Sequence, residues 1–249
     1  MSVFKDHFSS QAAQYRAARP SYPPRLFEVL AAHAPARECA WDAGCGNGQA
    51  SVALAGHFQR VMASDPSAEQ IANAQPHERV QYTVAAAEHS GLDAGSMDLV
   101  TVAQALHWFD VDAFHAEVRR VLKPGGIIAE WGYGECSVSV EVDAVFQVLY
   151  EDVLGAYWPA ERRHIENAYA DLAFPFETVA VPPLEMQTRW TLSHYLGYLA
   201  SWSALQRFRR EQGSNPLDGM RARFGAAWGE PGAERVVRWR LFTRVGRHG

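Results

Sequence analysis

The chain has 249 residues, of which 48% are hydrophobic and 20% are charged, and its formal net charge is −5. This composition provides one sizeable core and excludes a disordered, collagen-like or disulfide-rich protein. The net charge argues against a general nucleic-acid or membrane binder, because phosphates and anionic lipids would not be attracted over a broad surface.

The cysteines, Cys39, Cys45 and Cys136, form no CxxC pair, and three cannot all pair within one chain. The first residues lack the apolar run of a signal peptide, and no stretch has the length of apolar residues that a bilayer requires. A reducing compartment fits best, so we expect a cytoplasmic protein. No pattern in the sequence predicts an oligomeric state.

The first half of the chain alternates short apolar runs with amphipathic stretches, which is typical of βα units around a parallel sheet. Pro23 and Pro24 open the first predicted helix, and the turn at residues 123–126 ends the last one, because proline and glycine there cannot continue a helix. We predict helices over residues 26–33, 50–58, 68–74 and 111–122, and strands over residues 38–43, 60–64, 80–84, 97–103 and 127–131.

The second half changes character near Tyr133, which we interpret as a switch from scaffold to decoration within a single domain of residues 1–249. The two late strands, placed among helices, favour a hairpin-like pair over another βα unit. We predict helices over residues 140–158, 160–172, 191–208 and 216–228, and strands over residues 176–181 and 234–245.

A glycine loop spans residues 42–48 (DAGCGNG), after a predicted strand and before a predicted helix. Glycines there permit a tight turn and let a ligand approach the backbone without a Cβ in the way. The spacing is G-x-G-x-G, whereas a dinucleotide fingerprint would place its third glycine at Gln49. Such a loop alone is weak evidence, because it can be an ordinary turn.

Two carboxylates strengthen the interpretation of this loop. Asp42 ends its strand, where it would repel a pyrophosphate but attract a ligand that carries an ammonium and a sulfonium. Asp65 ends the next strand, so a doubly wound sheet places it beside the same crevice, where it can accept bonds from both ribose hydroxyls. Each carboxylate alone is more often a cap or turn residue. Together with the glycines, they favour a site for a positively charged nucleoside.

Six segments follow one another in a characteristic order: DAGCGNG at residues 42–48, DPS at 65–67, AAE at 86–88, DLV at 98–100, QALHWF at 104–109 and LKPGG at 122–126. In this order the chain resembles the class I S-adenosylmethionine-dependent methyltransferases, and within them the small-molecule branch that includes trans-aconitate methyltransferase. The resemblance covers roughly residues 4–131 and becomes loose afterwards, apart from YLASWS at residues 198–203.

The resemblance implies a fold as well as a chemistry. The fold is α/β, a Rossmann-like, doubly wound, mostly parallel sheet of seven strands with an antiparallel last strand. Its core covers about residues 25–133 and the C-terminal strands, and helical cap insertions cover about residues 140–172 and 191–229. The implied cofactor is S-adenosyl-L-methionine, with S-adenosyl-L-homocysteine as product.

The cofactor contacts carry over residue by residue. Asp42, Gly44 and Gly46 would hold the methionine part, and Asp65 would hold the ribose. Ala86 departs from the acidic residue that many relatives have at this position, so the adenine amino group needs another partner. The remaining candidates for contact with the cofactor are Ala87 and Glu88 beside the adenine, Tyr15 and Arg19 in a lid, and Gln104 beside the transferable methyl group.

Other residues are candidates for chemistry or for binding the acceptor. His107 is the best-placed general base, although a packing or positioning role beside Trp108 is the more frequent alternative. Arg19 suits bidentate binding of a carboxylate, with an ordinary surface arginine as the alternative. Trp158 and Trp202 are the first choices to line an acceptor pocket, which is typically concave and largely apolar.

We therefore predict methyl transfer from S-adenosylmethionine to a small molecule, with a carboxylic acid suggested by the resemblance alone. A carboxylate needs no general base, whereas a hydroxyl, amine or carbon acid would profit from one. Two alternatives stay open: a cofactor-binding module without turnover and, less favoured by the glycine spacing, an NAD-dependent oxidoreductase. No metal is expected, because the histidines show no ligand spacing such as HExxH. Neither nucleic acid nor membrane is an expected partner.

Overall fold

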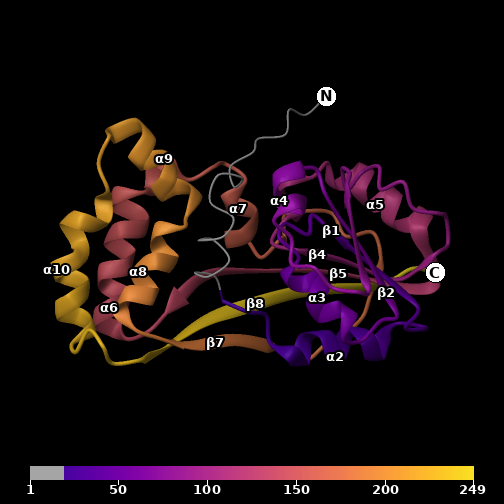
Figure 1. Cartoon of the computed structure of the whole chain (residues 1–249), viewed down its shortest axis with the longest axis horizontal. Coiled ribbons are helices and arrows are strands. Elements are labelled where there is room, and N and C mark those ends of the chain that lie inside the picture. Colours follow the sequence, from indigo (N-terminus) through magenta and orange to yellow (C-terminus); the bar gives the residue numbers. More distant parts are fainter. Residues whose placement is uncertain (1–19) are drawn as a thin grey trace.

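The computed structural model describes residues 20–249, and within them eight strands form one sheet (Figure 1). The strand order is β3-β2-β1-β4-β5-β8-β6, and β7 pairs with β8 beside this path. The strands are β1 (Cys39–Ala43), β2 (Arg60–Asp65), β3 (Val80–Val84), β4 (Met97–Ala103), β5 (Leu122–Ser137), β6 (Glu177–Thr178), β7 (Leu184–Trp190) and β8 (Arg235–Arg247).

The first five strands are parallel, and β8 is antiparallel to each of its three neighbours. The order of the strands reverses between β1 and β4, and ligands of such sheets bind outside the carboxyl ends of the strands at this switch point. The predicted α/β fold with a mostly parallel sheet and an antiparallel last strand is therefore confirmed. The sheet has eight strands in the described residues, one more than predicted.

The additional strand is β7, which the sequence pattern did not reveal. It follows Pro182 and Pro183, and four of its seven residues are polar, so its sequence is typical of a loop. Its register pairs Leu184 with Leu241 and Trp190 with Arg235, whereas the strand predicted over residues 176–181 is reduced to Glu177–Thr178. The late antiparallel pair thus consists mainly of β7 and β8.

Helices cover both faces of the parallel strands, so β1 and most of β4 are buried along their length. Successive residues of a strand point to opposite faces. Accordingly, Ala40 packs with α2 (Pro24–His33) and α3 (Gln49–Ala55), and Trp41 packs with α5 (Val111–Val121). The short helix α4 (Ala68–Ala72) follows β2. These layers fix the carboxyl ends of the strands, where the glycine loop begins.

Side-chain caps explain where two of these helices begin. Asp110 Oδ1 accepts the Ala113 backbone N–H at 3.2 Å at the start of α5, and Ser67 Oγ accepts that of Gln70 at 3.2 Å at the start of α4. The LKPGG turn begins inside β5, because Leu122 already has extended backbone angles.

The second half of the chain forms a helical cap. Figure 1 shows α6, α8, α9 and α10 gathered at one end of the molecule, apart from α2–α5, with β5 and β8 running between the two parts. The cap elements are α6 (Val140–Gln147), η3 (Val148–Val153), η4 (Gly155–Tyr157), α7 (Arg162–Glu166), α8 (Leu192–Ala200), α9 (Ser203–Gln212) and α10 (Pro216–Trp228).

The two longest predicted helices are interrupted in the structure. The segment over residues 140–158 changes from α-helix to a π turn at Val148, and the segment over 191–208 breaks at Ser201 and Trp202. Trp202 adopts extended backbone angles (φ −70°, ψ 139°), which end the helical path. Among the helices of residues 20–249, none combines the length and apolar character of a bilayer crossing.

Candidate functional site

A cavity of about 610 Å³ lies between the carboxyl ends of the parallel strands and the cap. From the sheet side it is lined by the glycine loop, Asp42, Asp65 and the residues that follow β4. From the cap side it is lined by residues of α7 and by the segment that joins α8 to α9. The volume suits a small-molecule site, since such pockets measure roughly 300–1,000 Å³.

The glycine loop has the left-handed backbone that the sequence suggests. Gly44 and Gly46 have φ angles of 66° and 53°. A Cβ on Gly44 would lie 2.7 Å from Ala105 Cβ and 2.8 Å from Phe109 Cζ, so the loop packs tightly against the QALHWF segment. A Cβ on Gly46 would meet only Gln70 Oε1, at 3.9 Å, so this glycine leaves its space to the cavity.

Asp42 is completely buried beneath the loop. Its carboxylate accepts hydrogen bonds from Ser51 Oγ at 2.6 Å and from Thr101 Oγ1 at 3.0 Å. Burial, opposed by these hydrogen bonds and assisted by the nearby charge of Asp65, raises the pKa of Asp42 from 3.8 to about 6. A cation in the cavity would favour the ionised form of this carboxylate.

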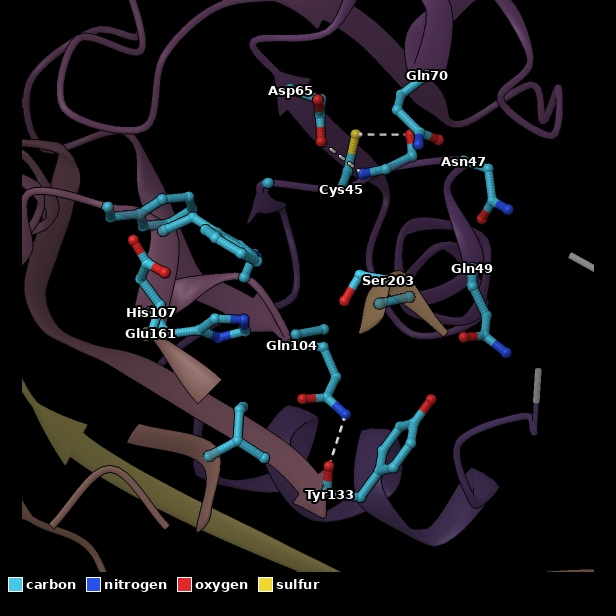
Figure 2. Close-up of a pocket in the computed structure, with 18 of the residues that line it drawn as sticks. Cys45, Asn47, Gln49, Asp65, Gln70, Gln104, His107, Tyr133, Glu161 and Ser203 are labelled. Carbon is cyan, nitrogen blue, oxygen red and sulfur yellow. Dashed lines mark hydrogen bonds between the residues drawn. The ribbon is translucent and has the colours of Figure 1, made fainter. Parts of the chain in front are cut away.

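Asp65 ends β2 and is anchored by two backbone amides. Its Oδ2 accepts the Gly46 N–H and its Oδ1 accepts the Ser67 N–H, both at 2.9 Å. Figure 2 shows this carboxylate beside the glycine loop. An ionised carboxylate has about four acceptor positions, so it can accept more hydrogen bonds than those of these two amides.

Gln104 follows β4 with a φ of 57°, an uncommon conformation for a residue other than glycine. Its backbone N–H donates to the Trp131 carbonyl at 2.9 Å. Its Nε2 donates to the Tyr133 carbonyl, also at 2.9 Å (Figure 2). These bonds tie the end of β4 to β5 and hold the strained backbone at the cavity wall.

His107 also lines the cavity, on the short 3-10 helix η2 (Leu106–Trp108). Its Nδ1 lies 3.2 Å from the hydroxyl of Tyr169, a residue that is buried and has a φ of 60°. Its ring packs on Trp108, with ring centroids 4.8 Å apart. No sequence pattern pointed to Tyr169, which lies 62 positions away from His107.

The aromatic residues proposed for the acceptor both line the cavity. The ring centroids of Trp158 and Trp202 are 5.4 Å apart, and Trp158 Nε1 donates to the Tyr150 carbonyl at 3.2 Å. Arg162 lines the same wall, with its guanidinium 4.9 Å from the centre of the Trp158 ring. Nothing in the spacing of the sequence distinguished Arg162 from the other arginines of the second half.

Other candidates lie elsewhere. Ala87 is buried in the core and Glu88 accepts the Asp110 backbone N–H at 2.9 Å, and neither lines the cavity. Near the glycine loop, the wall of the cavity instead includes Ser67 and Gln70, whose polar side chains can contact an adenine. Tyr15 and Arg19 lie outside the described residues. Within residues 20–249, no three His, Cys, Asp or Glu side chains are grouped as a metal site would require.

The residues present therefore fit the cofactor that the sequence suggests. Two carboxylates suit a ligand with a positively charged sulfur and amino group, and the space left by Gly46 admits the ligand to the backbone. Gln70 lines the cavity, and its amide can both donate to and accept from a base.

Comparisons with known proteins agree with this geometry. Residues 41–129 match the model of a methyltransferase domain. A Dictyostelium discoideum protein with the provisional name of a methyltransferase is 36% identical to this chain over 209 residues. The match covers 82% of this chain and 80% of that protein. A Saccharomyces cerevisiae protein with the provisional name S-adenosylmethionine-dependent methyltransferase is 26% identical over 243 residues, and the match covers 83% of each.

A solved structure from Anaeromyxobacter dehalogenans is also similar. It carries the provisional name of a type II methyltransferase and is 48% identical, with a TM-score of 0.87. The match covers 92% of this chain and 97% of that chain, so the similarity extends through the cap as well as the sheet.

Proposed function

Because this chain belongs to the class I S-adenosylmethionine-dependent methyltransferases, we propose that its cavity binds the cofactor beside a small-molecule acceptor that carries a carboxylate. The single observation that carries the proposal is the distribution of charge in one cavity. Asp42 and Asp65 lie at the glycine loop, whereas the cap wall carries Arg162 together with Glu161. Within residues 20–249, Arg162 is the sole lysine or arginine that lines the cavity.

Binding of the cofactor is assigned to the loop end of the cavity. Gly46 leaves room for the ligand, Asp65 accepts the ribose hydroxyls, and Asp42 supplies negative charge beneath the methionine part. We also propose that Gln70 meets the adenine. When bound, S-adenosyl-L-methionine supplies a methyl group on a positively charged sulfur.

The contribution of the protein to the transfer is alignment and the exclusion of water. Gln104 holds the wall at the end of β4 in a single conformation through its bonds to β5. Trp158 and Trp202 close the cap side with apolar rings. Positioning of two reactants in this way can lower a barrier by roughly 7–11 kcal/mol.

The acceptor is assigned to the cap end through Arg162. Its guanidinium stacks over Trp158, and its Nε donates to the Tyr150 hydroxyl at 3.1 Å, which fixes the orientation of the fork. An oriented guanidinium suits bidentate recognition of a carboxylate. The resemblance to the trans-aconitate methyltransferase branch supports the same acceptor class.

Two wider expectations are part of the proposal. We propose that residues 1–249 form a single domain, with the cap as an insertion that completes the cavity. We also propose a cytoplasmic location, which is supported by Cys39, Cys45 and Cys136, since none of them forms a disulfide.

The first experiment separates binding from turnover. Isothermal titration with S-adenosylmethionine and S-adenosylhomocysteine should show binding of both. Incubation with methyl-labelled cofactor should then label small di- and tricarboxylic acids, with trans-aconitate among them, in preference to phenols and amines. Binding of the cofactor without transfer to any acceptor would favour a binding module, and transfer to phenols or amines alone would refute the acceptor class.

The second experiment tests Arg162. Arg162→Gln should raise KM for the acid about tenfold or more, because hydrogen bonds to charged groups contribute about 1.5–3 kcal/mol. The affinity for S-adenosylhomocysteine should stay within about twofold of the parent value. Arg163→Gln is the matched control, since Arg163 is the exposed neighbour on the same helix. Equal effects of both substitutions would contradict the assignment.

A further inference from the structure

We infer that Glu161 and Arg162 together select an acceptor that carries a protonated amine as well as a carboxylate, with the amine at Glu161 and the carboxylate at Arg162. The inference rests on the proposed function for the carboxylate. It narrows the acceptor class to acids that bear an ammonium group, and it adds Glu161 as a residue that determines specificity.

Both charged residues reach the cavity from the start of α7. Their side chains line it, and so does that of Ile165, four positions after Glu161. Residues three and four positions apart share a face of a helix, so this face of α7 is turned toward the cavity. Arg163, by contrast, is exposed. Figure 2 shows the Glu161 side chain among those of the cavity wall.

A tight turn fixes the backbone of this segment. The Arg162 N–H donates to the Pro159 carbonyl at 3.0 Å, and the His164 N–H donates to the Glu161 carbonyl at 3.1 Å. Hydrogen bonds over three positions are those of a 3-10 turn. Pro159 also lines the cavity, so the turn itself forms part of the wall. The two charged side chains therefore start from an ordered backbone.

The Glu161 carboxylate has no counterion in the part of the chain that the structure describes. No hydrogen bond or ion pair joins it to another side chain of residues 20–249. The adjacent arginine is engaged elsewhere, since Arg162 Nε lies 3.1 Å from the Tyr150 hydroxyl and 3.9 Å from Glu166 Oε1. Arg162 therefore does not pair with Glu161.

The charge of Arg162 is already balanced by Glu166. The Tyr150 hydroxyl accepts from Arg162 Nε and donates to Glu166 Oε1 at 2.6 Å, so it links the guanidinium to a carboxylate. Within the described residues, neither Nη group of Arg162 takes part in a hydrogen bond. These two groups suit the carboxylate of a ligand. The unbalanced charge of the cap wall is thus that of Glu161.

The ligand has to supply the partner of Glu161. Occupation of the cavity removes water from its wall, and a carboxylate without water, a counterion or a donor is unfavourable. A plain acid would bring a further negative charge, whereas an ammonium group brings the opposite charge. An ammonium has three donors and no acceptor, which matches a carboxylate that only accepts. A hydroxyl would supply a single neutral donor.

The amino group of the cofactor is the competing partner of Glu161. The proposed function places the methionine part at Asp42, on the sheet side of the cavity, whereas Glu161 belongs to the cap. S-adenosylhomocysteine keeps this amino group. Its affinity for a Glu161 variant therefore separates the two assignments.

Two pairs of acids that differ only in the amine test the inference. They are glutamate with glutarate, and phenylalanine with 3-phenylpropionate. Isothermal titration of the protein saturated with S-adenosylhomocysteine should give a Kd at least about tenfold lower for the amine-bearing member of a pair that binds. In Glu161→Gln the two Kd values should lie within about twofold of each other, because a neutral amide does not pair with a cation.

The control is Glu151→Gln, the same change at an exposed position of the cap that does not line the cavity. It should keep the preference for the amine. Glu161→Gln should also keep the Kd of S-adenosylhomocysteine within about twofold of the parent value, as expected if the cofactor contacts other residues.

Three results would overturn the inference: equal affinity for both members of each pair in the parent protein, a preference that persists in Glu161→Gln, or a loss of S-adenosylhomocysteine affinity in this variant. If none of the four acids binds, the carboxylate of the proposed function fails, and butylammonium then decides the inference alone. This cation should bind the parent complex but not that of Glu161→Gln. Its failure to bind the parent complex, or equal binding to both, would also overturn the inference.

Discussion

Oδ2 of Asp65 accepts the backbone N–H of Gly46 at 2.9 Å, which ties the end of β2 to the glycine loop that follows β1. The bond thus joins the carboxylate at the end of β2 to the glycine loop, and these two features form the candidate cofactor site. In the proposed site this carboxylate has a double role, because it shapes the loop and is the acceptor assigned to the ribose hydroxyls. The loop and the ribose contact should therefore fail together.

Asp65→Asn tests this relationship. The amide oxygen can accept only one of the two backbone N–H groups at full strength, and the NH2 group opposes the other. We expect the Kd for S-adenosylhomocysteine to rise about 10- to 100-fold, as hydrogen bonds to a charged group contribute about 1.5–3 kcal/mol. Isothermal titration calorimetry measures the change. Asp152→Asn, at an exposed position of the cap, should leave the Kd unaltered; an unchanged Kd in Asp65→Asn would refute the ribose assignment.

The pH dependence of binding should follow Asp42. Its pKa lies near 6 in the ligand-free protein, and a positively charged ligand favours the ionised carboxylate. The affinity for S-adenosylmethionine should thus be nearly constant from pH 7 to 8 and fall as pH decreases through 6. Below the pKa, the affinity should decrease by up to about tenfold for each pH unit, because binding then requires the loss of a proton from Asp42.

Asp42→Asn is the control for this pH dependence. The amide does not titrate, so the variant should bind weakly and lose the decrease near pH 6 that the parent protein shows. Any titration of the ligand itself appears in both proteins and cancels in the comparison. The same decrease near pH 6 in parent and variant would assign it to another group.

The stability of the ligand-free protein should decrease as pH rises, whereas the affinity for S-adenosylmethionine should increase. The folded pKa of Asp42, about 6, is above its unfolded value of 3.8, so the folded state binds the proton more strongly. This stabilising contribution is complete below about pH 4 and is lost as pH rises through 6. Keeping the buried carboxylate ionised at pH 8 costs about 3 kcal/mol. Urea titrations should show that Asp42→Asn raises the free energy of unfolding more at pH 8 than at pH 5; equal differences at both pH values would contradict the burial argument.

Local patterns were sufficient to predict the parallel half of the fold. The βα alternation, the LKPGG turn and the strand-end carboxylates all depend on residues close in sequence, and the predicted strands at residues 60–64, 80–84 and 97–103 match β2, β3 and β4 closely. The cap was harder, because Trp202 ends its helix through tertiary packing and β7 is a strand only by virtue of its pairing with β8.

In the candidate site, too, the residues of local motifs could be predicted, whereas those placed by tertiary packing could not. The loop and strand-end residues that line the cavity are part of a compact motif, so sequence reasoning named them. Arg162 and Tyr169 belong to a short helix and a turn without a motif, and they reach the cavity or His107 only through the folding of the cap onto β5 and β8. The contact of Tyr169 with His107 spans 62 positions, and spacing alone does not reveal it.

The backbone and the side chain of Gln104 favour different residue types at this position. The φ of 57° favours glycine or asparagine, whereas the bond from Nε2 to the Tyr133 carbonyl at 2.9 Å requires the length of glutamine. Gln104→Asn should therefore keep or slightly raise the unfolding temperature but release the wall at the end of β4. Misplacement of a reactant by about 1 Å can cost about 100-fold in rate. Single-turnover kinetics with the best acid should show methyl transfer slowed at least tenfold, with the affinity for S-adenosylhomocysteine within about twofold. Gln147→Asn, a change of the same kind in α6, should leave the rate intact. A parental rate in Gln104→Asn would mean that the bond to Tyr133 stabilises the fold without aligning the reactants.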